Sequence, residues 1–93
     1  MTEKMKKRVE KAAILLKSAG CKEVFLFGSV AEGSDNENSD IDIAIKGCPP
    51  GRFFELLGKL MLELDCRVDL VNLDHEDAFS KHLLNNGQLL HVA

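Results

Sequence analysis

Residues 27–45 read FGSVAEGSDNENSDIDIAI, and this stretch decides the fold. An apolar run ends at its first glycine, a polar loop follows, and acidic and apolar residues then alternate from Asp40 to Ile45. Alternation with a period of two residues is typical of a β-strand. Asp40 and Asp42 are therefore predicted to share one face of a strand, with the isoleucines on the other face.

Two carboxylates this close together on one strand face need a counter-charge. Like charges about 4 Å apart repel each other by roughly 4 kcal/mol at an effective dielectric constant of about 20. A solvated strand face would weaken that repulsion, and a divalent cation would turn it into attraction. Mg²⁺ prefers carboxylate oxygens and is often bound by one or two carboxylates together with substrate phosphates. Asp40 and Asp42 are therefore a candidate Mg²⁺ site.

The glycine-serine corner before the polar loop supplies the second half of a candidate site. Gly28 lets a phosphate approach the backbone closely, Ser29 offers a hydroxyl, and successive free N–H groups can form an anion site. Residues 29–32 are predicted to form a short helical turn that ends at Gly33, with its first N–H groups facing the corner. A candidate phosphate site thus precedes the candidate cation site in the chain.

Gly28-Ser29, ten intervening residues and Asp40-Ile41-Asp42 resemble the signature of the nucleotidyltransferase superfamily related to DNA polymerase beta. In particular, the chain resembles the minimal nucleotidyltransferases, the antitoxin halves of toxin–antitoxin modules. The resemblance rests on two fixed ends, a fixed gap and the expected strand context, and it covers nearly the whole chain. It implies an α/β (α+β) fold, with a small mixed β-sheet and helices packed mainly on one face.

A third carboxylate, Asp69, lies in the apolar segment 67–71, where an isolated acid is costly to bury. The resemblance implies a third metal ligand on a strand beside the one that carries Asp40 and Asp42, and Asp69 occupies a matching position. The alternative is a surface aspartate on an edge strand, or a partner for Arg67.

Three carboxylates could hold two Mg²⁺ ions about 3.5–4 Å apart, which would stabilise the attacking and leaving oxygens of an in-line displacement. The expected reaction moves AMP from ATP to an acceptor hydroxyl. The expected catalytic and metal-binding residues are Asp40, Asp42 and Asp69, the last also as a candidate proton acceptor. The expected nucleotide-binding residues are Gly28, Ser29 and Ser39, the first two for the β- and γ-phosphates.

One position departs from the family pattern. Many relatives carry an arginine just before the second glycine of the loop, where this chain has Glu32 before Gly33. If that arginine assists the triphosphate, Glu32 predicts slower catalysis. Lys46 and Arg67 are the nearest basic residues in the sequence that could compensate.

Length and composition predict a single globular domain over residues 1–93. The chain is 45% hydrophobic and 29% charged, and no apolar run approaches the roughly 20 residues that span a bilayer. With no signal peptide recognised, a cytoplasmic location is expected. The formal net charge of −3 argues against a nucleic-acid partner. The basic cluster near the start is interpreted as a solvated helix face: Lys4, Lys6, Lys7, Arg8 and Lys11.

Periodicity and breaker residues predict the remaining elements. Helices are predicted over 3–19, 52–64 and 76–86, strands over 21–27, 40–45 and 66–73, and a short edge strand over 88–92. Thr2 is the predicted N-cap of the first helix and Gly20 its stop. The apolar face of the second long helix is predicted to be core: Phe53, Phe54, Leu56, Leu57, Leu60, Met61 and Leu64. Free thiols are expected for an odd set of cysteines without Cys-x-x-Cys spacing: Cys21, Cys48 and Cys66.

The acceptor follows from the resemblance alone. It implies a helical HEPN-type toxin as partner, modified on a tyrosine, because the chain has no room for an acceptor-binding domain of its own. One alternative is a non-catalytic module that neutralises its partner by occlusion; another is transfer to a small molecule or an RNA end. A homo-oligomer is also compatible with the sequence, and the apolar residues near the C-terminus are candidates for a contact surface: Leu89, Leu90 and Val92.

Overall fold

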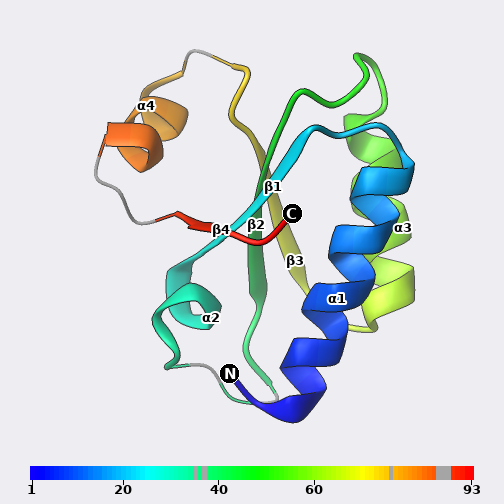
Figure 1. Cartoon of the computed structure of the whole chain (residues 1–93), viewed down its shortest axis with the longest axis vertical. Helices are drawn as coiled ribbons and strands as arrows, with labels where there is room; N and C mark the ends of the chain where they lie inside the picture. Colours follow the sequence, from blue (N-terminus) through cyan, green and yellow to red (C-terminus); the bar gives the residue numbers. More distant parts are fainter. Residues whose placement is uncertain (35, 37, 76, 86–88) are drawn as a thin grey trace.

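In the computed structural model, the described residues form one mixed sheet with the strand order β3-β2-β1-β4 (Figure 1). The structure describes residues 1–34, 36, 38–75, 77–85 and 89–93. β1 runs antiparallel to β2 and β4, and β2 runs parallel to β3, so the expected mixed sheet is confirmed. In chain order the elements are α1 (Glu3–Ser18), β1 (Glu23–Phe27), α2 (Gly28–Glu32), β2 (Ile41–Lys46), α3 (Phe53–Leu64), β3 (Val68–Asn72), α4 (Ala78–Asn85) and β4 (Leu90–His91).

The predicted elements are all present, and local capping explains where the first helices begin and end. The Thr2 hydroxyl accepts a hydrogen bond from the Met5 N–H at 3.0 Å, as expected for an N-cap. Gly33 ends α2 in the left-handed conformation, with φ at 79°. Three predicted boundary positions, 76, 86 and 88, lie outside the described residues.

The two long helices cover one face of the sheet. α1 and α3 lie side by side in Figure 1 and share one buried apolar cluster with the strands. Each fully buried leucine or isoleucine contributes roughly 1.5–3 kcal/mol. The cluster includes Met5, Val9, Ala12 and Leu16 of α1, Leu56, Leu60 and Leu64 of α3, and Val24, Leu26, Ile41, Ile43 and Ile45 of the sheet.

The opposite face of the sheet is covered only in part. A smaller cluster consists of Ala44 of β2, Leu73 just after β3, and Leu83 of α4. Phe27 packs against this cluster. Because side chains alternate along a strand, this cluster lies on the face that also carries Asp42. α4 therefore covers one end of the face that holds the carboxylates.

The prediction that the whole apolar side of α3 is core was wrong for two residues. Phe54 is 82% exposed and Met61 is 46% exposed. On a helix with 3.6 residues per turn, both lie about a third of a turn away from the buried row of Leu56 and Leu60. α3 therefore presents a narrower buried face than its composition suggests.

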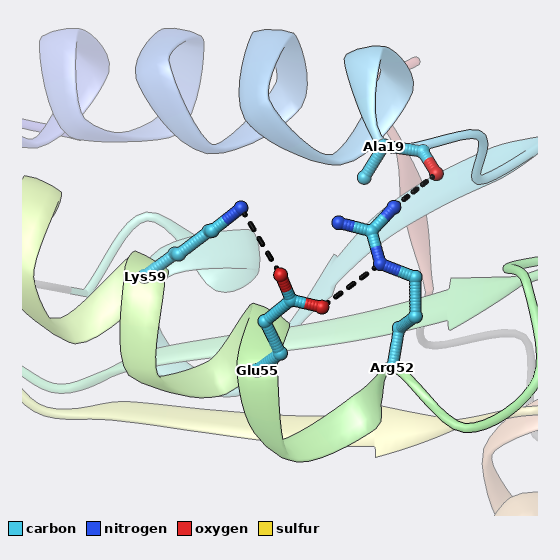
Figure 2. Close-up of polar contacts among 4 residues, drawn as sticks. All are labelled: Ala19, Arg52, Glu55 and Lys59. Carbon is cyan, nitrogen blue, oxygen red and sulfur yellow. Dashed lines mark hydrogen bonds and ion pairs between the residues drawn. The ribbon is translucent and has the colours of Figure 1, made fainter.

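Polar contacts join the first turn of α3 to the end of α1 (Figure 2). Arg52 Nη1 donates to the Ala19 carbonyl at 3.1 Å, and Arg52 Nε donates to Glu55 Oε2 at 2.9 Å. Lys59 Nζ lies 3.3 Å from Glu55 Oε1. Exposed ion pairs contribute little by themselves, so the main role of Arg52 is to satisfy a carbonyl left open at the end of α1.

The expectation of three free thiols was wrong, because Cys21 and Cys48 form a disulfide. β1 and β2 pair with Glu23 opposite Lys46. Extending this register by two residues beyond each strand places Cys21 opposite Cys48. Cys66 is a free, half-buried cysteine.

The C-terminal segment completes the sheet. The Val92 N–H donates to the Val24 carbonyl at 2.9 Å, and Leu89 packs against the smaller apolar cluster. Of the three apolar residues expected to form a contact surface, Leu90 is the one with a large exposed fraction, 44%. Among the described residues, no helix has the length and apolar character needed to cross a membrane.

Candidate functional site

The glycine corner lies directly against a carboxylate. β1 ends at Phe27 and α2 begins at Gly28, whose φ of +70° favours glycine. A Cβ atom at this position would collide with Asp42 Oδ2 and lie 3.1 Å from Asp42 Cγ. Among the described residues, no side chain caps the start of α2, so its first N–H groups can bind a ligand. The sequence-predicted Gly28 and Asp42 are thus brought together.

Two of the predicted carboxylates lie side by side on neighbouring strands. In the parallel β2–β3 pair, Asp42 is in register with Asp69, so the two carboxyl groups lie close enough to interact. Burial, the interaction with the Asp69 carboxyl group and the negative charge of Asp40 raise the pKa of Asp42 from its ordinary 3.8 to about 6. The site therefore concentrates negative charge, and the third predicted aspartate contributes to it.

Asp40 lies just before β2, near the start of β3. Burial raises the pKa of the Cys66 thiol, the Arg8 charge opposes this rise, and the charges of Asp40 and Asp65 add to it. Arg8 is only 9% exposed, so the interpretation of the whole basic cluster as a solvated helix face was wrong for this residue. Arg8 and Asp40 thus both lie within electrostatic range of Cys66.

The donor chemistry of the site fits Mg²⁺. Asp40, Asp42 and Asp69 offer the hard oxygen ligands that this ion prefers, and their crowding raises the pKa of Asp42 in a way that a cation would reverse. In the part of the chain that the structure describes, no three His, Cys, Asp or Glu side chains are already gathered around a common point. The carboxylates that would hold Mg²⁺ are therefore adjacent without forming a closed cage.

The two serines have different surroundings. Ser29 lies in the first turn of α2, where its carbonyl accepts from the Ser34 N–H at 3.0 Å. The Ser39 hydroxyl accepts from the Asn36 N–H at 2.9 Å, so it stabilises the loop that leads into Asp40. Ser29 is thus beside the glycine corner, and Ser39 is engaged in the loop.

The basic residues proposed to compensate for Glu32 lie at opposite ends of the sheet. Lys46 is the last residue of β2 and pairs with Glu23, at the end remote from Gly28. The Arg67 carbonyl accepts a hydrogen bond of 3.0 Å from the N–H of Ile41, the residue directly after Asp40. Of these two residues, Arg67 is therefore the one whose backbone lies beside the site, and Glu32 itself is exposed.

Sequence reasoning missed an aromatic pair beside the carboxylates. Phe27 is in register with Asp42, and its ring contacts that of Phe79 of α4 with centroids 6.0 Å apart. The alternation of β1 could have placed Phe27 on this face, but only with the β1–β2 register known. The contact with Phe79 depends on tertiary packing and has no signal in the local sequence.

Comparison with known proteins agrees with the expected resemblance. A family model described as "Polymerase beta, Nucleotidyltransferase" matches residues 10–93. The chain is 44% identical over 54 residues to the protein adenylyltransferase MntA of Shewanella oneidensis, a match that spans 54% of this chain and 38% of that protein. The chain therefore matches well under half the length of this curated relative.

Solved structures show the same fold. One is a toxin–antitoxin complex with AMP-PNP, with a TM-score of 0.68 at 28% identity over 97% of this chain and 72% of the matched chain. Another is a tri-AMPylated HEPN toxin of Shewanella oneidensis in complex with an MNT antitoxin, with a TM-score of 0.67 at 26% identity over 92% and 69% of the two chains. The expected fold class is confirmed by these similarities.

Proposed function

The chain belongs to the polymerase beta nucleotidyltransferase family, and on that premise we propose that it transfers AMP from ATP to a hydroxyl of a HEPN-type toxin, acting as the antitoxin. The acceptor proposed is a tyrosine, and the proposed compartment is the cytoplasm. The observation that carries the proposal is the register of Asp42 with Asp69 beside the Gly28 backbone. Carboxylates next to an open backbone corner suit a metal-assisted reaction of a phosphate ester.

The similar structures support the choice of substrate and partner. One contains AMP-PNP, an ATP analogue, and another contains a HEPN toxin that carries three AMP groups. The formal net charge of −3 is less favourable to an RNA acceptor.

Each side chain has a role that follows from its surroundings. Gly28 and Ser29 bind the β- and γ-phosphates through N–H groups and a hydroxyl, which directs attack to the α-phosphorus. Asp42, half-buried beneath the glycine corner, would hold the metal ions together with Asp40. Asp69 is exposed, so it can reach an incoming hydroxyl and accept its proton. Ser39 is proposed to contact the nucleotide from the loop.

Two Mg²⁺ ions, when bound by the three aspartates, would supply charge compensation for the attacking and leaving oxygens. The residues around these ions position the reacting groups. Catalysis of this kind depends mainly on positioning and electrostatic stabilisation. The rigid β2–β3 register provides that positioning for Asp42 and Asp69.

The direct test is label transfer to a HEPN-type partner in the presence of Mg²⁺. With ATP labelled at the α-phosphate, the partner is expected to become labelled, and mass spectrometry should locate AMP on a tyrosine. With ATP labelled at the γ-phosphate, no label should appear on the partner, because the β- and γ-phosphates leave together. Label from the γ-phosphate alone would contradict nucleotide transfer.

A second candidate function is neutralisation by occlusion, favoured by Glu32 at the position where the family resemblance implies an arginine in many relatives. It predicts a stable complex and an inhibited toxin with no label on the partner from either form of ATP. The same experiment therefore distinguishes the two functions.

Arg67 is expected to assist the triphosphate. Arg67→Gln should weaken the affinity for Mg-ATP about fivefold, because one exposed positive charge near a phosphate contributes on the order of 1 kcal/mol in water. Isothermal titration would measure this, and the effect should shrink in 0.5 M salt as screening increases. Lys46→Gln is the matched control, since it removes the same charge at the remote end of β2. Equal effects of the two substitutions would contradict a local role for Arg67.

A further inference from the structure

We propose that Phe27 and Phe79 form an aromatic platform that binds the purine base of the nucleoside triphosphate by stacking. The inference rests on the proposed function and extends it from the phosphates to the base. Stacking on an aromatic side chain suits any base, because every base has a π-face. The platform thus assigns a second part of the substrate to named residues.

The platform lies on the face of the sheet that carries the carboxylates. Phe27 is the register partner of Asp42, and paired residues on neighbouring strands point to the same face. Phe27 also directly precedes Gly28, where the phosphates are proposed to bind. A nucleotide with its phosphates at the corner therefore has an aromatic surface next to them.

Phe79 extends this surface beyond the strand. It comes from α4, and its ring meets that of Phe27 in an edge-to-face contact, with centroids 6.0 Å apart and the planes at 65°. Phe27 is half-buried, whereas Phe79 remains 47% exposed. A fixed aromatic ring that is still half open to solvent can accept a second ring without rearrangement of the core.

A second phenylalanine provides the internal comparison. Phe54 is 82% exposed and contacts the ring of Phe53, with centroids 5.4 Å apart. It lies on α3, which packs on the face of the sheet opposite the carboxylates. Phe54 and Phe79 are therefore both exposed and both contact another aromatic ring. Of the two, only Phe79 lies next to the site.

A single-fluorophore experiment tests the platform. The chain contains no tryptophan and no tyrosine, so Phe79→Trp and Phe54→Trp each introduce one indole. Mg-ATP is expected to quench the emission of the Phe79→Trp protein, because a base stacks on the indole, and Mg-tripolyphosphate is expected to leave it unchanged. Neither ligand should affect the Phe54→Trp protein.

Titration calorimetry supplies the second measurement. Phe79→Ala should lower the affinity for Mg-ATP about 5- to 150-fold, the range that removal of a stacking ring produces, with the affinity for Mg-tripolyphosphate unchanged. Phe79→Leu keeps an apolar side chain against Phe27 and should show the same selective loss, which covers the case in which the alanine variant folds poorly.

The outcomes separate the two levels of the proposal. Equal losses for both ligands, or an unchanged affinity for Mg-ATP, would overturn the platform while leaving the phosphate and metal site in place. If the unaltered protein binds neither Mg-ATP nor Mg-tripolyphosphate, the proposed nucleotide site is wrong, and the platform falls with it.

Discussion

Replacing Asp42 by Asn is expected to abolish nucleotide transfer and, in the same protein, to raise the free energy of unfolding at pH 7. The loss of activity should be on the order of 10³-fold, because a carboxylate that neutralises charge through a metal contributes several kcal/mol to transition-state stabilisation. The gain in stability follows from the burial of the Asp42 carboxylate and from its crowding by Asp69 and Asp40. Such a cost to folding is expected where carboxylates are gathered to bind a cation, because they repel one another while the cation is absent.

The pH dependence has a definite sign. The pKa of Asp42 in the folded protein is about 6, above its ordinary 3.8. The folded state therefore holds the proton more tightly than the unfolded state, and the stability that this provides is present below pH 4 and lost as the pH rises to 6. Because the carboxyl is partly exposed, solvent screening reduces the effect to about 1 kcal/mol. Asp42→Asn should thus match the parent protein at pH 4 and exceed its melting temperature by about 4–8 °C at pH 7.

Thermal denaturation in EDTA between pH 4 and pH 8 measures this difference without bound metal. Glu10→Gln is a suitable control, because it also removes one negative charge, from an exposed position on α1. It should leave the pH profile of stability unchanged. An Asp42→Asn protein that is less stable than its parent at pH 7 would show that the carboxylate supports the fold instead of straining it.

Local pattern was enough to predict most of the fold. The helices and strands could be predicted because their signals lie in neighbouring residues: Thr2 caps α1, Gly33 ends α2, and alternation marks β2. The site was partly predictable for the same reason. Gly28 and Asp42 belong to one motif, and their closeness follows from the strand, loop and strand between them.

The features that were not predicted depend on registers between distant segments. Asp69 could be matched to a motif position, but its place beside Asp42 requires the β2–β3 register. The burial of Arg8 and the aromatic contact of Phe79 require helix packing that no local pattern encodes. The Cys21–Cys48 bond required the β1–β2 register, which spacing between cysteines does not reveal.

That disulfide leads to the second large effect expected. It joins residues 27 positions apart, and the loop that it closes contains both Gly28 and Asp42. Closing a loop of this length reduces the entropy of the unfolded chain by an amount equivalent to about 3–4 kcal/mol at 25 °C. For a domain whose total stability is about 5–15 kcal/mol, reduction should remove a large share of it. Urea denaturation with and without dithiothreitol measures the loss.

The Cys21→Ala/Cys48→Ala protein is the matched control, because it should have the lower stability already and show no further response to dithiothreitol. Cys66→Ala should keep the full response, since Cys66 takes no part in the bond. The bond lies beyond the ends of β1 and β2 that are remote from Gly28, so the affinity of the folded protein for Mg-ATP should be unchanged on reduction. If dithiothreitol leaves the denaturation curve of the unaltered protein in place, the bond does not constrain the chain. If reduction instead lowers the affinity in the folded state, the two ends of β1 and β2 are coupled, and the register that aligns Asp42 with the glycine corner depends on the disulfide.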